Sequence, residues 1–258
     1  MDGNVDFSAN AGLYDRRHGA RLPQDVLEAL CVASGLAEHS RILEIGAGTG
    51  RVSVPMAEGR FRMTALDISA EMLRTLRTKA APGLLAVVCA DAAAAPFKAQ
   101  AFDAVIIARV VYLVPNWRSM LGEARRVLKA QGPILYEWGN GTGREMWARI
   151  RDRAREILER AGVDTPFHPG ARSDADVDRC LQRSGLRCVA EIAGEALPAI
   201  SPSQFVTQIA TGECSYMWRV PAHLRAACLH ELNAWVQDQF AQDLVENATG
   251  SWKVYRQP

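Results

Sequence analysis

The sequence lacks the residue patterns that build metal sites and disulfide frameworks. Its six cysteines are scattered along the chain, none belongs to a CxxC pair, and none lies beside a cluster of the five histidines. Zinc sites and secreted disulfide scaffolds depend on such patterns. We therefore expect no metal site and no disulfide framework.

A net charge and a long apolar run are also missing. The 30 basic residues nearly balance the 29 acidic ones, which argues against nucleic acid as a partner, since binding to phosphates needs positive charge. No segment reaches the roughly 20 apolar residues of a membrane span. Residues 1–10 have no apolar core of the signal-peptide kind. We expect a cytoplasmic protein without a membrane span.

Short apolar runs alternate with amphipathic segments through the first 140 residues. Strands are expected at 41–45, 61–66, 84–89, 102–108 and 133–138, and helices at 23–36, 51–58, 69–79 and 116–129. Repeated strand–helix–strand units with short links predict a parallel sheet with helices on both faces. The strands are almost continuously apolar, as in a sheet that is buried on both sides.

The second half of the chain adds helices and two late strands. Helices are expected at 144–161, 173–184, 201–210 and 221–245, and strands at 186–192 and 252–256. We therefore predict an α/β fold with a doubly wound, mostly parallel, seven-stranded sheet and a helical cap inserted before the last strand. The expected domains are 1–36, an N-terminal arm and helix; 37–140, a binding core; and 141–258, which completes the sheet and holds the cap at about 195–248.

A glycine-rich loop lies between the first expected strand of the core and the next helix. Gly46, Gly48 and Gly50 follow Glu44 at a GxGxG spacing. Glycine permits a tight turn and a close approach of ligand to backbone, and the amides at the following helix start suit an anionic group. Arg51 occupies the place of the third glycine of a dinucleotide-binding GxGxxG motif. Glu44 at the loop entry is able to attract a cationic group.

Two later strands are followed by acidic residues. Asp67 follows the second strand of the core and Asp91 follows the third. The carboxyl ends of parallel strands meet at one edge of a sheet, so both side chains are expected near the glycine loop. A carboxylate at Asp67 can accept hydrogen bonds from both hydroxyls of a ribose, and one at Asp91 can accept from an adenine amino group beside the backbone of Ala92.

Five motifs within residues 41–138 resemble the core of class I S-adenosylmethionine-dependent methyltransferases, in particular the small-molecule branch that includes ubiquinone- and menaquinone-pathway enzymes. The matching segments are 42–50, 66–69, 89–92, 102–105 and 123–129 before Gly132. They cover well under half of the chain, but their order and spacing are specific together.

The resemblance implies a role for each residue of the site. The backbone at Gly46 and Ala108 would hold the methionine amino group of S-adenosylmethionine, supported by Glu44. Asp67 would hold the ribose. The other implied cofactor contacts are Ala47, Gly48, Gly50, Ile68, Met72, Asp91 and Ala92. Related enzymes often carry His at the position of Arg109, so Arg109 is expected to reach the methionine carboxylate or an acidic acceptor instead.

The polar N-terminal segment is expected to be a flexible arm or a lid. In similar enzymes a tyrosine near the position of Tyr14 folds over the cofactor, and His18 would be a further contact; a surface turn is the alternative for both. Trp138 is expected to face the crevice, where it would line an acceptor pocket. Candidates for a general base are Glu137, Tyr112 and His18, and none is assigned.

These features favour a methyltransferase that acts on a small-molecule acceptor. Methyl transfer from a sulfonium is an in-line displacement, so the main task is to position the acceptor and exclude water. Three alternatives stay open: a methyltransferase acting on RNA or protein, a nicotinamide-dependent dehydrogenase, and a non-catalytic cofactor-binding module.

Overall fold

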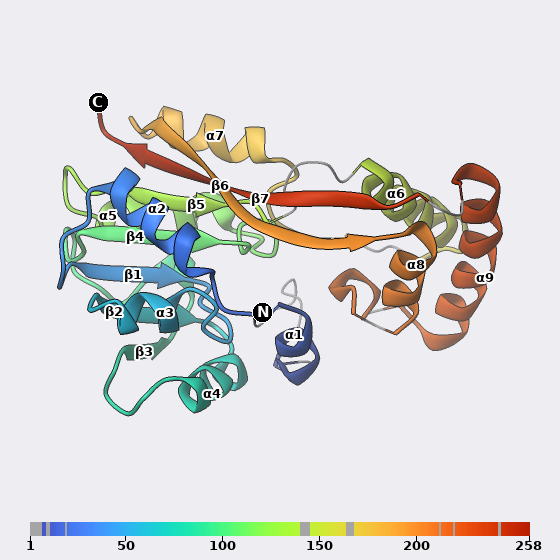
Figure 1. The fold of residues 1–258 in the computed structure, drawn as a ribbon, viewed down its shortest axis with the longest axis horizontal. Helices are drawn as coiled ribbons and strands as arrows, with labels where there is room; N and C mark the ends of the chain where they lie inside the picture. Colours follow the sequence, from blue (N-terminus) through green and yellow to red (C-terminus); the bar gives the residue numbers. More distant parts are fainter. Residues whose placement is uncertain are drawn as a thin grey trace. The chain divides into compact units, whose positions relative to one another are not determined.

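The computed structural model describes residues 7–8, 11–18, 20–139, 145–163, 168–211, 213–218, 220–241 and 244–258, and only the backbone of Leu13, Arg16, Arg17, His18 and Tyr216. In chain order the elements are α1 (Ala11–His18), α2 (Gln24–Ser34), β1 (Arg41–Ile45), α3 (Ser53–Glu58), β2 (Arg62–Asp67), α4 (Ala70–Lys79), β3 (Ala86–Cys89), η1 (Ala92–Ala94), β4 (Ala104–Ala108), α5 (Trp117–Val127), β5 (Ile134–Glu137), α6 (Glu145–Arg160), α7 (Asp174–Arg183), β6 (Arg187–Ile200), α8 (Pro202–Ala210), η2 (Ser215–Met217), α9 (Ala222–Gln239) and β7 (Glu246–Arg256) (Figure 1).

The strands form one seven-stranded sheet in the order β3-β2-β1-β4-β5-β7-β6. Strands β1 to β5 pair in parallel, and β7 pairs antiparallel with β5. The α/β fold with a mostly parallel sheet is therefore confirmed. In the central register, Ile45 pairs with Leu66 on one side and with Ile107 on the other. Gly46, Asp67 and Ala108, which follow these three residues, therefore lie at the same level at the carboxyl edge of the sheet.

Alternate residues of the central strands pack into two different hydrophobic cores. Leu43 and Ile107 face one core, which includes the apolar side chains of α5 and α7. Ile42 and Ile106 face the other, which includes those of α2 and α3. Successive side chains of a strand point to opposite faces, so the fully apolar strands are explained by a sheet that helices cover on both sides.

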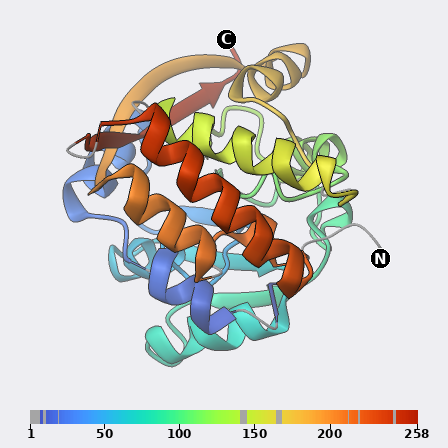
Figure 2. The ribbon, with the colours of Figure 1, turned by 90° about the vertical axis from the view of Figure 1, so that its right-hand side faces the viewer.

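The chain divides into two compact units. Unit 1 comprises residues 1–139, 169–195 and 251–258, and unit 2 comprises residues 140–168 and 196–250. In unit 2, α9 packs on α6 and α8, and these helices share a separate hydrophobic core (Figure 2). The carboxylate of Glu246 accepts a hydrogen bond of 2.8 Å from the amide of Met146, in the first turn of α6. Among the described helices, none is long and apolar enough to cross a membrane.

Three elements of the second half differ in length from the prediction. Strand β6 continues to Ile200 instead of ending at 192, and β7 begins at Glu246 instead of 252. Both extensions contain poor strand formers, Gly194 and Pro198 in β6 and Gly250 in β7. Strand pairing between neighbours overrides such local preferences. Helix α9 ends at Gln239 instead of 245, because Phe240 takes an extended backbone conformation and its ring contacts Trp235 edge-on.

The N-terminal segment contains a helix that the sequence does not predict. Helix α1 packs against α4, and Asp15 forms an ion pair with Lys79. The segment is short and polar, and isolated helices of this length are marginal in water. Contacts with α4 therefore account for α1, which explains why the local sequence did not reveal it.

Candidate active site

The glycine loop between β1 and α3 has three glycines in the left-handed region. Gly46, Gly48 and Gly50 have φ values of 71°, 54° and 88°. A Cβ at Gly46 would lie 2.4 Å from Cγ2 of Val110, and one at Gly50 would lie 2.8 Å from Cγ of Leu76. The amides of Gly46 and Ala47 both donate to the carbonyl of Leu66, at 2.8 and 3.0 Å. The loop is therefore held against the end of β2 in a conformation that other residues do not readily adopt.

Asp67 connects this loop to the start of α4. Its Oδ2 accepts a hydrogen bond of 2.8 Å from the amide of Gly48, and its Oδ1 accepts one of 2.8 Å from the amide of Ser69. Ser69 caps α4 by accepting from the amide of Met72, as expected. Burial raises the pKa of Asp67, against the lowering effect of the backbone hydrogen bonds. Each carboxylate oxygen has a further lone pair for a ligand hydroxyl.

Glu44 is buried at the carboxyl end of β1, with 3% of its surface exposed. The hydroxyl of Ser53, at the start of α3, donates to Oε2 of Glu44. Burial raises the pKa of Glu44 from 4.5 to about 7, and the Ser53 hydrogen bond offsets part of that rise. A carboxylate in this state gains most from a cationic neighbour.

The residues expected around an adenine ring differ in exposure. Ile68 is 50% exposed, while Met72 on α4 is 2% exposed. Asp91 is exposed and its Oδ1 accepts a hydrogen bond of 2.8 Å from the amide of Ala93. Asp91 therefore caps η1, which begins at Ala92. This capping role accounts for one oxygen of Asp91 without a ligand.

Tyr14 on α1 lies over the glycine loop. A Cβ built on Gly48 would be 3.9 Å from Cε1 of Tyr14, and the ring of Phe7 contacts Tyr14 edge-on at 5.5 Å. Burial raises the pKa of Tyr14, while the charges of Arg109 and Arg51 lower it, so the phenol remains protonated near neutral pH. The backbone of His18 ends α1, and its side chain lies outside the described part of the structure.

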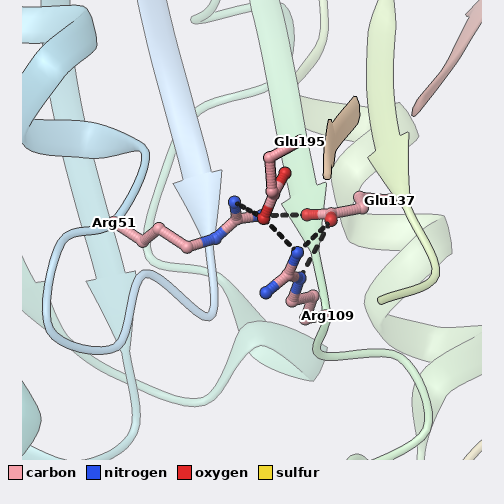
Figure 3. Close-up of polar contacts among 4 residues, drawn as sticks. All are labelled: Arg51, Arg109, Glu137 and Glu195. Atoms are coloured by element: carbon pink, nitrogen blue, oxygen red, sulfur yellow. Dashed lines mark hydrogen bonds and ion pairs between the residues drawn. The ribbon is translucent and has the colours of Figure 1, made fainter. Parts of the chain in front are cut away.

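Two arginines and two glutamates form a buried network beside the loop (Figure 3). Arg109 donates to Oε1 of Glu137 through Nε at 2.9 Å and Nη2 at 2.7 Å, while Arg51 pairs with Oε2 of Glu137. Both arginines also contact Oε1 of Glu195, Arg51 at 2.8 Å. The side chains of Arg51, Arg109, Glu137 and Glu195 are 11%, 12%, 0% and 16% exposed.

Burial and pairing act in opposite directions on the pKa values of this network. Burial lowers the pKa of Arg109, but Glu137 and Glu195 raise it, and the net shift is upward. Burial raises the pKa of Glu195, but Arg51 and Arg109 lower it, and the net shift is downward. Arg109 and Glu195 are therefore both ionised at neutral pH.

Arg109 has an unusual backbone conformation that directs its side chain toward Glu137. It follows Ala108 at the end of β4 and has a φ of 55°, in the left-handed region that costs a non-glycine residue about 1–2 kcal/mol. A Cβ at Gly139 would lie 2.6 Å from Cγ of Arg109. The space occupied by the Arg109 side chain therefore requires glycine at position 139.

The structure also bears on Glu137 and Trp138. Both oxygens of Glu137 accept from guanidinium groups, so protonation of Glu137 would break its ion pairs, which makes it a poor general base. Trp138 follows β5 instead of ending it, packs against the hydrophobic core and contacts the ring of Tyr112 at 5.5 Å.

Sequence reasoning missed the joint role of Arg51 and Glu195. In the sequence, Arg51 stands out only as the residue at the place of a third glycine. The useful signal was the presence of opposite charges, Arg51, Arg109 and Glu137, at the ends of apolar segments that converge in a parallel sheet. Glu195 had no local signal, because the strand that carries it was expected to end at residue 192.

Comparison with known families identifies the core. Residues 43–136 match the family model described as a methyltransferase domain. The chain therefore contains a class I S-adenosylmethionine-dependent methyltransferase domain, which confirms the resemblance of its motifs, and members of this family use S-adenosylmethionine.

Curated relatives include several methyltransferases. An uncharacterized methyltransferase of Mycobacterium tuberculosis is 29% identical over 80% of this chain and 83% of its own length. A malonyl-(acyl-carrier protein) O-methyltransferase of Geobacter sulfurreducens is 29% identical over 72% of this chain and 68% of its own length. An uncharacterized Mycobacterium tuberculosis protein is 36% identical, over 41% of this chain. The aligned part spans 39% of that relative's length.

Solved structures share the fold at low sequence identity. A candidate methyltransferase of Bacillus halodurans has a TM-score of 0.64 and 17% identity, with 92% of this chain and 100% of that chain covered. The cyclase SpnF has a TM-score of 0.57 and 17% identity, with 91% and 80% covered. One fold thus carries both a methyltransferase and a cyclase, so the fold alone does not name the reaction.

Proposed function

We propose that this chain transfers a methyl group from S-adenosylmethionine to a small-molecule acceptor. The observation that carries the proposal is the convergence of Glu44, Asp67 and Asp91 at the carboxyl ends of neighbouring strands, around a loop that requires glycine. The family match of this segment supports the choice of cofactor.

The residues of the loop and strand ends fit the polar groups of this cofactor. Glu44, buried and hydrogen-bonded to the hydroxyl of Ser53, would meet the ammonium group, together with the backbone at Gly46 and Ala108. Asp67 would accept from the ribose hydroxyls through its remaining lone pairs. The remaining proposed contacts are Tyr14, His18, Ala47, Gly48, Gly50, Ile68, Met72, Asp91, Ala92 and Arg109.

The chemistry required of the protein itself is limited. The cofactor supplies a methyl group already activated on a sulfonium. The protein would position an acceptor atom at about 3–3.5 Å and exclude water. Tyr14 lies over Gly48, so α1 would shield the loop from solvent. No residue is proposed as general base, and an acceptor that loses its proton readily needs none.

Two findings support a small-molecule acceptor. The Geobacter sulfurreducens relative is named as a malonyl-(acyl-carrier protein) O-methyltransferase, and its named acceptor is not a nucleic acid. The formal net charge of +1 gives the chain no overall attraction for RNA. An affinity for RNA that collapses with added salt would favour the RNA-directed alternative instead.

Calorimetry with S-adenosylhomocysteine tests the cofactor site. Asp67→Ala should weaken binding at least about tenfold, since it removes the acceptors for the ribose and for Gly48. Asp103→Ala is the matched control: Asp103 pairs with Lys129 and the amide of Arg41, before β4 begins, and its loss should leave the affinity unchanged. Unchanged affinity in Asp67→Ala would refute the assignment of this site.

A titration with NADH separates the cofactor proposal from the dehydrogenase alternative. Arg51 occupies the place of the third glycine of a dinucleotide motif, and its side chain is held by Glu137 and Glu195. We expect no saturable NADH fluorescence change under conditions in which S-adenosylhomocysteine binds. Tight NADH binding would reverse the proposal.

A further inference from the structure

The two carboxylates of the arginine network are bound very differently. Glu137 ends β5, is fully buried, and has both oxygens bonded to guanidinium groups. Glu195 lies on β6 and is the most exposed of the four side chains, at 16%. Arg51 and Arg109 both contact its Oε1. Its Oε2 is buried and accepts no hydrogen bond from any other residue that the structure describes.

This arrangement leaves Glu195 only half satisfied. An arginine fork matches a carboxylate best when two parallel N–H groups meet both oxygens. Glu195 offers one oxygen to two arginines, and a buried acceptor without a donor is costly. A carboxylate that approached from another direction and presented both oxygens would bind the same arginine pair better.

Charge balance indicates exchange of carboxylates instead of addition. Arg51 and Arg109 together carry two positive charges, which Glu137 and Glu195 neutralise. A third carboxylate would add an uncompensated charge to a largely buried group, which is unfavourable. A carboxylate that replaced Glu195 would preserve neutrality.

The place of the arginines indicates the ligands they would meet. Arg51 follows Gly50 of the loop, and Arg109 follows Ala108 at the end of β4. Both therefore adjoin the proposed cofactor site. A carboxylate there comes either from the methionine end of the cofactor or from an acidic acceptor.

We propose that Arg51 and Arg109 form a carboxylate-binding subsite that Glu195 occupies in the free protein and that a ligand carboxylate takes over on binding. The inference rests on the proposed function for the identity of the ligand. The exchange itself depends only on the geometry of the four side chains.

The first arm of the test compares S-adenosylhomocysteine with its decarboxylated form, which lacks only the carboxylate. Glu195→Gln removes the competing charge and retains the shape of the side chain. If the cofactor supplies the carboxylate, this variant should bind S-adenosylhomocysteine about tenfold more tightly and bind the decarboxylated form as the parent protein does. Glu191→Gln, at an exposed position of the same strand, should change neither affinity.

The second arm compares benzoate with benzamide, with and without saturating S-adenosylhomocysteine. If an acceptor supplies the carboxylate, Glu195→Gln should strengthen benzoate binding alone, and the gain should persist with the nucleoside bound. Arg109→Lys keeps the positive charge but loses the paired N–H donors of the guanidinium group. In the arm where the carboxylate-bearing ligand is preferred over its uncharged counterpart, this variant should reduce that preference. Thermal unfolding confirms that each variant is folded, and Glu195→Ala, which also removes the competing carboxylate, replaces Glu195→Gln if that variant does not fold.

The two proposals fail in distinguishable ways. If the parent protein binds neither nucleoside, the proposed function fails, while the benzoate–benzamide difference measured without nucleoside still tests the subsite. If neither Glu195→Gln nor Glu195→Ala prefers the carboxylate-bearing ligand over its uncharged counterpart more strongly than Glu191→Gln does, in either arm, the carboxylate subsite is refuted whatever the nucleoside affinity is.

Discussion

Glu44 and Glu137 are both buried carboxylates, but their partners differ. Glu137 is neutralised by two guanidinium groups, whereas Glu44 receives a hydrogen bond from the hydroxyl of Ser53. Burying a charge without a counter-charge is costly. The charge of Arg51 offsets only part of the cost of burying Glu44, whose pKa stays raised, so a cationic ligand would stabilise the ionised form of Glu44 further, while Glu137 already pairs with two guanidinium groups.

This difference predicts how the ionisation of Glu44 makes the stability of the protein depend on pH. Burial raises its pKa from 4.5 to about 7, so the folded protein keeps a proton that the unfolded chain loses first. The stabilising contribution is fully present below the unfolded value and is lost as the pH rises through about 7. Relative to Glu44→Gln, the free energy of unfolding of the parent protein should fall as the pH rises from 4.5 to about 7. The slope should reach about 1.4 kcal/mol per pH unit, and above pH 7 the loss should level off.

Urea denaturation of both proteins at a series of pH values measures the effect. The difference between parent and variant cancels the other titrating groups, including Asp67 and Glu137. Parallel pH profiles for the two proteins would show that Glu44 does not titrate in this way.

At the residue scale, part of the candidate site followed from the sequence. Glu44 and Asp67 were predictable because strand ends of a parallel sheet converge at one edge. The partners of Arg109 were not, since they depend on the left-handed backbone of Arg109 and on a glutamate 86 positions away in the chain. Such contacts leave no periodic signal.

The loop from β1 to α3 carries the clearest prediction at the scale of single elements. Gly46→Ala places a methyl group 2.4 Å from Val110 at a φ of 71°. We expect it to cost about 2–4 kcal/mol of stability, from backbone strain and overpacking, and to weaken S-adenosylhomocysteine binding. Gly122→Ala is the matched control, because Gly122 is exposed within α5 and a Cβ there meets nothing within 4 Å.

The change in stability caused by the control substitution should have the opposite sign. Alanine within a helix is favoured over glycine by about 0.5–1 kcal/mol, so Gly122→Ala should stabilise the protein and leave binding intact. Chemical denaturation and calorimetry on both variants measure the two effects. Equal stability of the two variants would contradict the strain assigned to the loop.

Apart from α1 and η1, the elements of the first 139 residues were predictable because apolar strands and amphipathic helices there are bounded by clear turn or capping residues. Ser69 before α4 and Gly35 after α2 are such residues, and both act as caps. The extents of β6 and β7 were not predictable, because Pro198 and Gly250 oppose strand structure locally and only pairing overrides them.

The division into two units has a thermodynamic consequence for the whole molecule. The described residues proposed to contact the cofactor all belong to unit 1, while Ile150 lies in the separate core of unit 2. Ile150→Ala and Ile106→Ala each remove the same buried volume, from side chains that are 0% and 1% exposed, at a cost of about 2–5 kcal/mol. Their effects on ligand-linked unfolding should differ.

Calorimetric unfolding with and without S-adenosylhomocysteine measures that difference. The ligand should raise the midpoint of the transition that Ile106→Ala lowers, since ligand binding stabilises the unit that binds it. Ile150→Ala should lower a transition that the ligand does not move, and should leave the affinity within about twofold of the parent value. A single transition that both variants lower equally would show that the units unfold as one.

Arg109 and Gly139 show how a network of this kind constrains sequence change. Position 139 accepts no Cβ while the long side chain at 109 lies against it, and Arg109 keeps its strained backbone beside Glu137. Gly139 also has a φ of 102°, which L side chains rarely adopt. Loss of the Arg109 side chain would therefore remove the steric clash at position 139 but not the backbone strain, so two separate constraints keep glycine there.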